Sequence, residues 1–186
     1  MVLSGIVIRV DDAETIEQLA KAGTGSDGEK GAAFYDEAFT TIQEYHTHYT
    51  ASVYYFAWMV IIDRIRQAKP RSLLEIGCGP GQLARAIGDA FPAIDYVGFD
   101  FSPVAIGAAS AHSPRIRFEV ADALTTDLLA GQYDASPIGT EFREHVEQEM
   151  DVLAKLRPGT LFIGTVPNFP YVSHVRHFKM MQGVRR

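Results

Sequence analysis

The sequence predicts an α/β fold in which a doubly wound, mostly parallel sheet is covered by helices on both faces. The stretch LLEIGCGPGQL at residues 73–83 has the pattern of a buried strand, a glycine-rich turn and the start of a helix. A second apolar strand over residues 96–99 ends in Asp100, and a third is expected over residues 116–120. Strands that alternate with helical patterns are typical of a parallel sheet.

The turn after the first strand carries Gly77, Gly79 and Gly81 directly behind Glu75. Because glycine has no Cβ, the backbone N–H groups of such a turn can closely approach a nucleotide-like ligand. Asp100 follows about 20 residues later, at the end of the second strand, where a carboxylate can accept hydrogen bonds from ribose hydroxyls. Taken alone, the glycines also fit a tight strand-to-helix turn without any ligand.

Three segments together resemble the class I methyltransferases that use S-adenosylmethionine: the loop EIGCGPG, the segment GFDFS after the second strand, and ADAL after the third. The resemblance spans residues 73–177. It implies a Rossmann-like methyltransferase fold with S-adenosylmethionine as the cofactor. The cofactor-binding residues that it implies are Glu75, Gly77, Cys78, Gly79, Gly81, Asp100, Phe101, Ser102, Asp122 and Ala123.

Residues 34–68 are helical in pattern and rich in aromatic side chains. They fit two helices with a break near residues 50–52, and we expect Phe56 and Trp58 in the core. We expect the second helix to direct an apolar stripe toward the sheet, formed by Val60, Ile61, Ile62 and Ile65. The resemblance implies that both helices form a lid that shapes the acceptor pocket, with the candidates Tyr35, Tyr45, His48, Tyr49 and Tyr54.

The remaining elements complete the expected domain. Helices are expected over residues 82–90, 103–110 and 141–156, and a fifth strand over 161–166. A fourth strand is expected over 132–138, in which Pro137 indicates a bulge or an early end. We divide the chain into an N-terminal segment (1–31), a helical lid (32–69) and a cofactor-binding catalytic domain (70–186).

The fifth strand is the last that the sequence predicts, whereas the family's sheet continues with two more strands. An uncovered apolar edge strand favours aggregation. We therefore expect this edge to be covered by the N-terminal segment, by the C-terminal tail, or by a second subunit in a homodimer.

Glu141, Glu144 and His145 fall on one side of the helix expected over residues 141–156. This E-x-x-E-H pattern resembles the metal-holding motif of ubiquinone-pathway O-methyltransferases and small-RNA 2′-O-methyltransferases, which implies magnesium or manganese beside the acceptor hydroxyl. Acids that only stabilise the first turn of a helix are the alternative. Candidates for a general base are His145, His174 and His177.

Composition limits the partners and the compartment. A chain of 186 residues with 47% hydrophobic side chains suits one globular domain, and the net charge of −6 argues against long nucleic-acid duplexes as partners. Cys78 is the single cysteine, so no internal disulfide can form, and we expect a reducing, cytoplasmic location. No run of ~18 apolar residues predicts a membrane span.

These observations lead to a ranked set of functions. The first is a methyltransferase that acts on a small molecule with an apolar or aromatic portion. The second is an RNA 2′-O-methyltransferase-like enzyme with a metal at Glu141, Glu144 and His145, and the third is a non-catalytic cofactor-binding module or truncated domain. A nicotinamide-dependent dehydrogenase ranks last, because the loop lacks G-x-G-x-x-G spacing.

Overall fold

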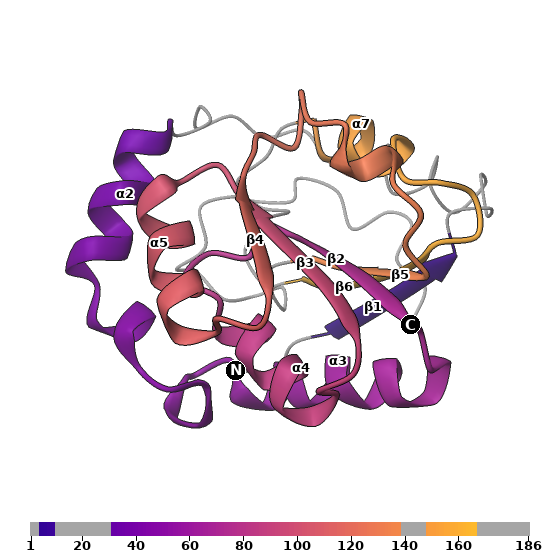
Figure 1. The fold of residues 1–186 in the computed structure, drawn as a ribbon, viewed down its shortest axis with the longest axis horizontal. Coiled ribbons are helices and arrows are strands. Elements are labelled where there is room, and N and C mark those ends of the chain that lie inside the picture. Colours follow the sequence, from indigo (N-terminus) through magenta and orange to yellow (C-terminus); the bar gives the residue numbers. More distant parts are fainter. Residues whose placement is uncertain (1–3, 10–30, 139–147, 167–186) are drawn as a thin grey trace.

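The sheet is the centre of the fold in the computed structural model, which describes residues 4–9, 31–138 and 148–166. Within these residues the strand order is β1-β6-β5-β2-β3-β4. The strands are β1 (Ser4–Arg9), β2 (Ser72–Ile76), β3 (Asp95–Asp100), β4 (Arg117–Val120), β5 (Ala135–Pro137) and β6 (Leu161–Val166). Strands β2 to β6 are parallel and β1 is antiparallel to β6, which confirms the predicted doubly wound, mostly parallel sheet (Figure 1).

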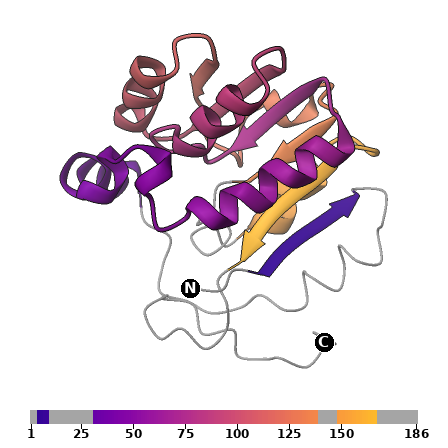
Figure 2. The same cartoon turned by 90° about the horizontal axis from the view of Figure 1, so that it is seen from below.

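Helices cover both faces of this sheet. Helices α3 and α4 lie on one face and α7 lies on the other, while α2 lies beside α5 (Figure 1). Figure 2 shows α3 running along the sheet next to β6. The helices are α2 (Ala32–Thr41), α3 (Tyr55–Ala68), α4 (Gln82–Ala90), α5 (Pro103–His112) and α7 (Glu149–Ala154), with short 3-10 turns η1 (Gln43–His46), η2 (Tyr49–Ala51) and η3 (Leu128–Ala130).

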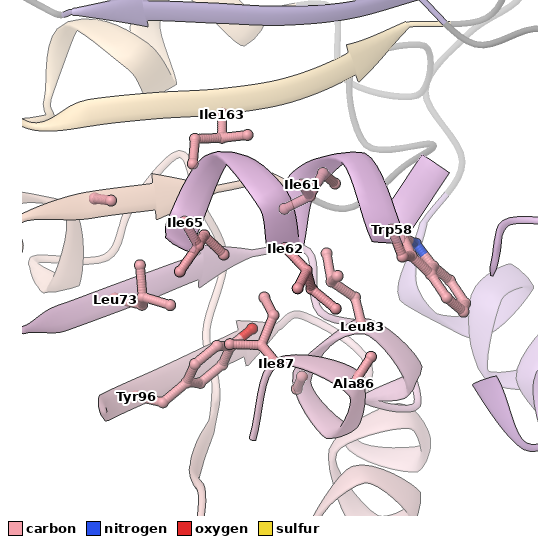
Figure 3. Close-up of a cluster of buried hydrophobic side chains, with 12 residues drawn as sticks. Trp58, Ile61, Ile62, Ile65, Leu73, Leu83, Ala86, Ile87, Tyr96 and Ile163 are labelled. Atoms are coloured by element: carbon pink, nitrogen blue, oxygen red, sulfur yellow. The ribbon is translucent and has the colours of Figure 1, made fainter. Parts of the chain in front are cut away.

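Two hydrophobic clusters fill the spaces on either side of the sheet. Strand β2 contributes side chains to both clusters, because successive side chains of a strand point to opposite faces. Leu73 belongs to one cluster, and Leu74 and Ile76 belong to the other. The first cluster, under α3 and α4, is drawn in Figure 3 and includes Trp58, Ile61, Ile62, Ile65, Leu83, Ile87 and Tyr96. The second cluster, under α7, includes Val97, Phe99, Leu129, Val152, Leu153 and Phe162.

The buried face of α3 differs in part from the prediction. Trp58 is buried as expected, but Phe56 is 81% exposed and Val60 is 50% exposed. With 3.6 residues per turn, these two residues share the face opposite Ile62 and Ile65, which are both buried. The prediction of a core position for Phe56 and Val60 was therefore wrong.

The sheet edge and the fourth strand follow the predictions more closely. Strand β1 pairs with β6 from Ser4↔Val166 to Arg9↔Leu161, so the N-terminal segment, one of the three expected partners, covers this edge. Strand β5 has only 3 residues and ends at Pro137, as expected for a residue that has no N–H for the ladder. None of the described helices has the length and apolar character needed to cross a membrane.

Candidate functional site

The loop between β2 and α4 has a backbone that favours glycine. Gly77, Gly79 and Gly81 have φ angles of 65°, 50° and 80°. L side chains rarely adopt this left-handed region. At Gly81 a Cβ would also lie 2.8 Å from the Cβ of Ala109 in α5. The glycines therefore let the loop turn tightly and let α5 pack against it.

Asp100 joins this loop to the end of β3. Its carboxylate is 6% exposed and accepts a 2.9 Å hydrogen bond from the Gly79 N–H at Oδ2 and another of 2.9 Å from the Ser102 N–H at Oδ1. Burial raises the pKa of Asp100 above its usual value, although the backbone hydrogen bonds oppose this shift. Each carboxylate oxygen has a second lone pair, so Asp100 can accept further hydrogen bonds from a ligand.

Glu75 supplies a second buried carboxyl group next to the loop. It is 1% exposed, and the Tyr96 hydroxyl donates a 2.5 Å hydrogen bond to its Oε2. Burial raises the pKa of Glu75 to about 8; the Tyr96 hydrogen bond lowers it, and the charge of Asp100 raises it. Near neutral pH, the free protein therefore holds Glu75 largely in its protonated form.

Helix α2 lies over the same edge of the sheet. The Ser102 hydroxyl donates to the Asp36 carboxylate of α2 and caps α5 by accepting a 3.1 Å hydrogen bond from the Ala105 N–H. The Phe39 ring is 3.6 Å from the point where a Cβ of Gly79 would lie. Neither Asp36 nor Phe39 is among the residues predicted from the sequence, although their spacing of three on an expected helix places them on one face.

The connection after α2 is fixed to the first turn of α4 by Gln82. Its side-chain amide donates to the main-chain oxygens of Glu44, at 3.0 Å, and Thr47, at 2.8 Å. The Glu44 carboxylate in turn accepts hydrogen bonds from the Ser52 hydroxyl, at 2.7 Å, and the Val53 N–H, at 3.0 Å. Gln82 is a further residue that the sequence did not single out, because nothing in the sequence links it to a segment about 35 residues earlier.

A family model described as "Methyltransferase domain" matches residues 73–158, which include the glycine loop, Asp100 and Asp122. The matched part of the chain, just under half of its residues, is similar to this methyltransferase domain. The chain is 37% identical over 65 residues to a trans-aconitate 2-methyltransferase of Methylobacterium radiotolerans, covering 35% of this chain and 25% of that protein. It is 32% identical over 92 residues to a demethylmenaquinone methyltransferase of Thermus thermophilus, covering 47% of this chain and 42% of that protein. The chain thus spans less than half the length of these curated relatives.

Solved structures agree with the methyltransferase fold. The plantazolicin methyltransferase BpumL in complex with SAH matches with a TM-score of 0.58 at 20% identity, over 84% of this chain and 62% of that chain. Its complex with a pentazolic desmethylPZN analog and SAH matches with a TM-score of 0.56 at 23% identity, over 83% of this chain and 62% of that chain.

The fold brings the residues predicted for cofactor binding to the carboxyl ends of β2, β3 and β4. The Ala121 N–H donates to the Asp100 main-chain oxygen at 2.9 Å, which places the segment after β4 beside the end of β3. Asp122 is exposed and accepts a 2.8 Å hydrogen bond from the Leu124 N–H, whereas Ala123 is buried in the second cluster. Cys78 is buried, and its N–H donates to the Phe99 main-chain oxygen at 3.0 Å.

The residues predicted for the acceptor pocket are not all at the glycine loop. The Tyr35 ring lies 5.2 Å from that of Phe101, next to Asp100. The Tyr45 ring lies 4.8 Å from that of Phe39, which faces Gly79. The others lie elsewhere: the Tyr49 hydroxyl donates to Asp89 near the far end of α4, the exposed His48 lies against Tyr49, and Tyr54 packs on the first cluster.

Glu141, Glu144, His145, His174 and His177 lie outside the described residues. The metal site and the general base expected at these positions stay predictions. In the ranges 4–9, 31–138 and 148–166, no three or more His, Cys, Asp or Glu side chains are grouped to hold a metal ion.

Proposed function

We propose that this chain is an S-adenosylmethionine-dependent methyltransferase that acts on a small molecule with an apolar or aromatic portion. The observation that carries the proposal is the glycine loop flanked by two buried carboxyl groups: Glu75, which precedes it in β2, and Asp100, which accepts the Gly79 N–H. The match to the methyltransferase domain supports it. So do the names of the curated relatives, whose acceptors trans-aconitate and demethylmenaquinone are small molecules.

The residues at this edge fit the proposed cofactor. Asp100 has lone pairs left for ribose hydroxyls, and the Gly79 N–H holds its carboxylate beside the loop. Glu75 and Asp100 together offer acidic groups to a ligand that carries a sulfonium and an ammonium group. When bound, the cofactor supplies a methyl group already activated by its positive sulfur.

The protein then has to orient the cofactor and the acceptor and to exclude water. Good orientation can lower the activation free energy by up to ~7 to 11 kcal/mol. Helix α2 suits this role, because Tyr35 and Phe39 lie against Phe101 and Gly79 at the edge where the cofactor would bind. A base is needed only for a protonated acceptor, and His145, His174 and His177 are proposed for it.

Calorimetry with S-adenosylmethionine, S-adenosylhomocysteine and NAD tests the proposed cofactor. We expect heat with the first two ligands and none with NAD; no heat or thermal shift with either adenosyl compound overturns the proposal. Asp100→Ala should weaken binding more than tenfold, because ribose donors lose their buried acceptor. Asp63→Ala, in the exposed part of α3, should leave binding unchanged.

An acceptor screen that scores release of S-adenosylhomocysteine separates an enzyme from a non-catalytic cofactor-binding module. The proposed role of magnesium or manganese at Glu141, Glu144 and His145, on which the RNA 2′-O-methyltransferase alternative depends, is tested in the same assay. Activity that survives both chelation and Glu144→Gln removes the metal from the proposal. The homodimer and the cytoplasmic location expected from the sequence stay predictions.

A further inference from the structure

The hydrogen bond between Tyr96 and Glu75 joins two side chains that are almost fully buried. Tyr96 is 5% exposed, Glu75 is 1% exposed, and their oxygens are 2.5 Å apart. The register of β2 and β3 explains the contact: Tyr96 pairs with Leu73, and Glu75 follows two residues later on the same face of the sheet. The Tyr96 hydroxyl thus contacts the residue two positions beyond its own pairing partner in β2, in the direction of the glycine loop.

The described surroundings of Tyr96 are mainly apolar. Figure 3 shows Tyr96 among apolar side chains of the first cluster, with Ile61, Ile62 and Ile65 from α3 and Leu83 and Ile87 from α4. The titratable groups that influence the pKa of Glu75 are Tyr96 on β3 and Asp100 at the end of β3, and Glu75 in turn raises the pKa of Cys78 in the loop. Among these groups, only the Tyr96 hydroxyl has a hydrogen bond to the carboxyl group of Glu75.

We propose that Tyr96 is a positioning residue that holds the Glu75 carboxyl group for a cationic cofactor and stabilises its ionised form, so that binding of the cation releases the Glu75 proton. This inference rests on the proposed function, because it needs a ligand with a positive charge at this edge. The proton leaves the Glu75 carboxylic acid for the solvent, and the carboxylate that remains faces the ligand's positive charge.

The direction of the pH dependence follows from the charge of Glu75. With its pKa at about 8, the free protein at pH 7 must lose a proton before Glu75 can pair with a cation. Affinity should therefore rise about tenfold per pH unit below that pKa and level off above it. Without the Tyr96 hydroxyl, the carboxylate loses its hydrogen-bond donor, so the pKa of Glu75 rises and the midpoint moves to higher pH.

The test is calorimetry of S-adenosylmethionine binding to the full chain and to Tyr96→Phe from pH 6.0 to 9.5. We expect Tyr96→Phe to bind roughly tenfold more weakly at pH 7, as suits one lost hydrogen bond to a charged group, with a deficit that shrinks toward pH 9.5. Titration of the ligand's own amino group is common to both proteins. A deficit of equal size at every pH would mean that Tyr96 only supports the fold, and would overturn the inference.

A second measurement on the unaltered protein does not depend on the folding of a variant. Heats measured at pH 7 in buffers of different ionisation enthalpy should show release of close to one proton with S-adenosylmethionine, as Glu75 is then mostly protonated. Glu75→Gln and the uncharged ligand 5′-methylthioadenosine should each release none. Tyr133→Phe, at the start of the segment leading to β5, should keep the pH profile of the full chain. If S-adenosylmethionine binds without proton release, Tyr96 has no such role and the proposed cofactor still stands.

Discussion

The side-chain amide of Gln82 lies 2.8 Å from the main-chain oxygen of Thr47, and it also donates to the main-chain oxygen of Glu44. One side chain at the start of α4 thus holds the segment that follows α2 against the glycine loop. Because this segment has no buried side chain in η1 or η2, its position depends on such hydrogen bonds more than on hydrophobic packing. Gln82 therefore couples the segment between α2 and α3 to the proposed cofactor site.

Replacing Gln82 by alanine should remove these hydrogen bonds; the main-chain oxygen of Thr47 loses this donor, whereas that of Glu44 keeps the Thr47 hydroxyl. We expect the free energy of unfolding in urea to fall by about 1–3 kcal/mol, and amide exchange in residues 43–54 to become faster. Gln67→Ala is the matched control: its partners Asp63 and Arg64 are exposed residues of the same helix. The control should change stability by less than ~0.5 kcal/mol, and equal effects of both substitutions would contradict the bridging role of Gln82.

Substitution by alanine should have opposite effects on stability at Gly81 and at Gly107. Gly81→Ala places a Cβ 2.8 Å from Ala109 at a φ of +80°, so we expect a loss of more than ~2 kcal/mol in the free energy of unfolding. Gly107→Ala, inside α5, meets no atom within 4 Å and should stabilise the protein by about 0.5–1 kcal/mol. Thermal and urea unfolding measure both, and a stable Gly81→Ala variant would show that the loop does not need glycine there.

Local patterns were sufficient to predict most of the sheet and the helices that follow its first strands. The apolar runs around Leu73, Val97 and Ile163 become β2, β3 and β6, because a strand covered on both faces must be apolar throughout. The prediction for Phe56 was wrong because it relied on the aromatic character of the residue. Its exposure depends instead on its position around the helix, on the face opposite Ile62 and Ile65.

The candidate site was predictable only where its chemistry lies in one continuous segment. Glu75, the loop glycines and Asp100 occur at spacings that a reader of the sequence can recognise. Asp36, Phe39 and the Tyr96 hydroxyl reach the site from residues distant in sequence, so their contacts depend on strand register and on helix packing. Tyr49 shows the reverse case, because its hydroxyl bonds Asp89 rather than facing the loop.

The edge of β6 should depend on β1. Among the described strands, a variant lacking residues 1–9 leaves β6 paired with β5 alone, so an apolar strand acquires a free edge. We expect amide exchange in residues 161–166 to become faster than in the full chain, and the mass in solution to rise through association. Unchanged exchange in a variant that remains monomeric would contradict the pairing of β1 with β6.

Glu75 should give stability an unusual pH dependence. Its pKa is about 8 in the folded protein, against about 4.3 in an unfolded chain, so the folded state binds more protons between these values. The free energy of unfolding should therefore fall as the pH rises from 5 to 8, since the contribution of Glu75 is complete at low pH and is lost through its folded pKa. Burial shifts the pKa of Asp100 in the same direction.

Glu75→Gln removes the titrating group but keeps an oxygen that can accept the hydrogen bond of Tyr96. Urea unfolding at pH 5, 6.5 and 8 should therefore show a shallower decline in this variant than in the full chain. The exposed Glu37→Gln on α2 should keep the original slope, because its carboxyl group is in solvent in both states. The titrations of the other groups contribute equally to all three proteins. If the free energy of unfolding of Glu75→Gln and of the full chain changes with pH in parallel, Glu75 is ionised in the folded state well below pH 8.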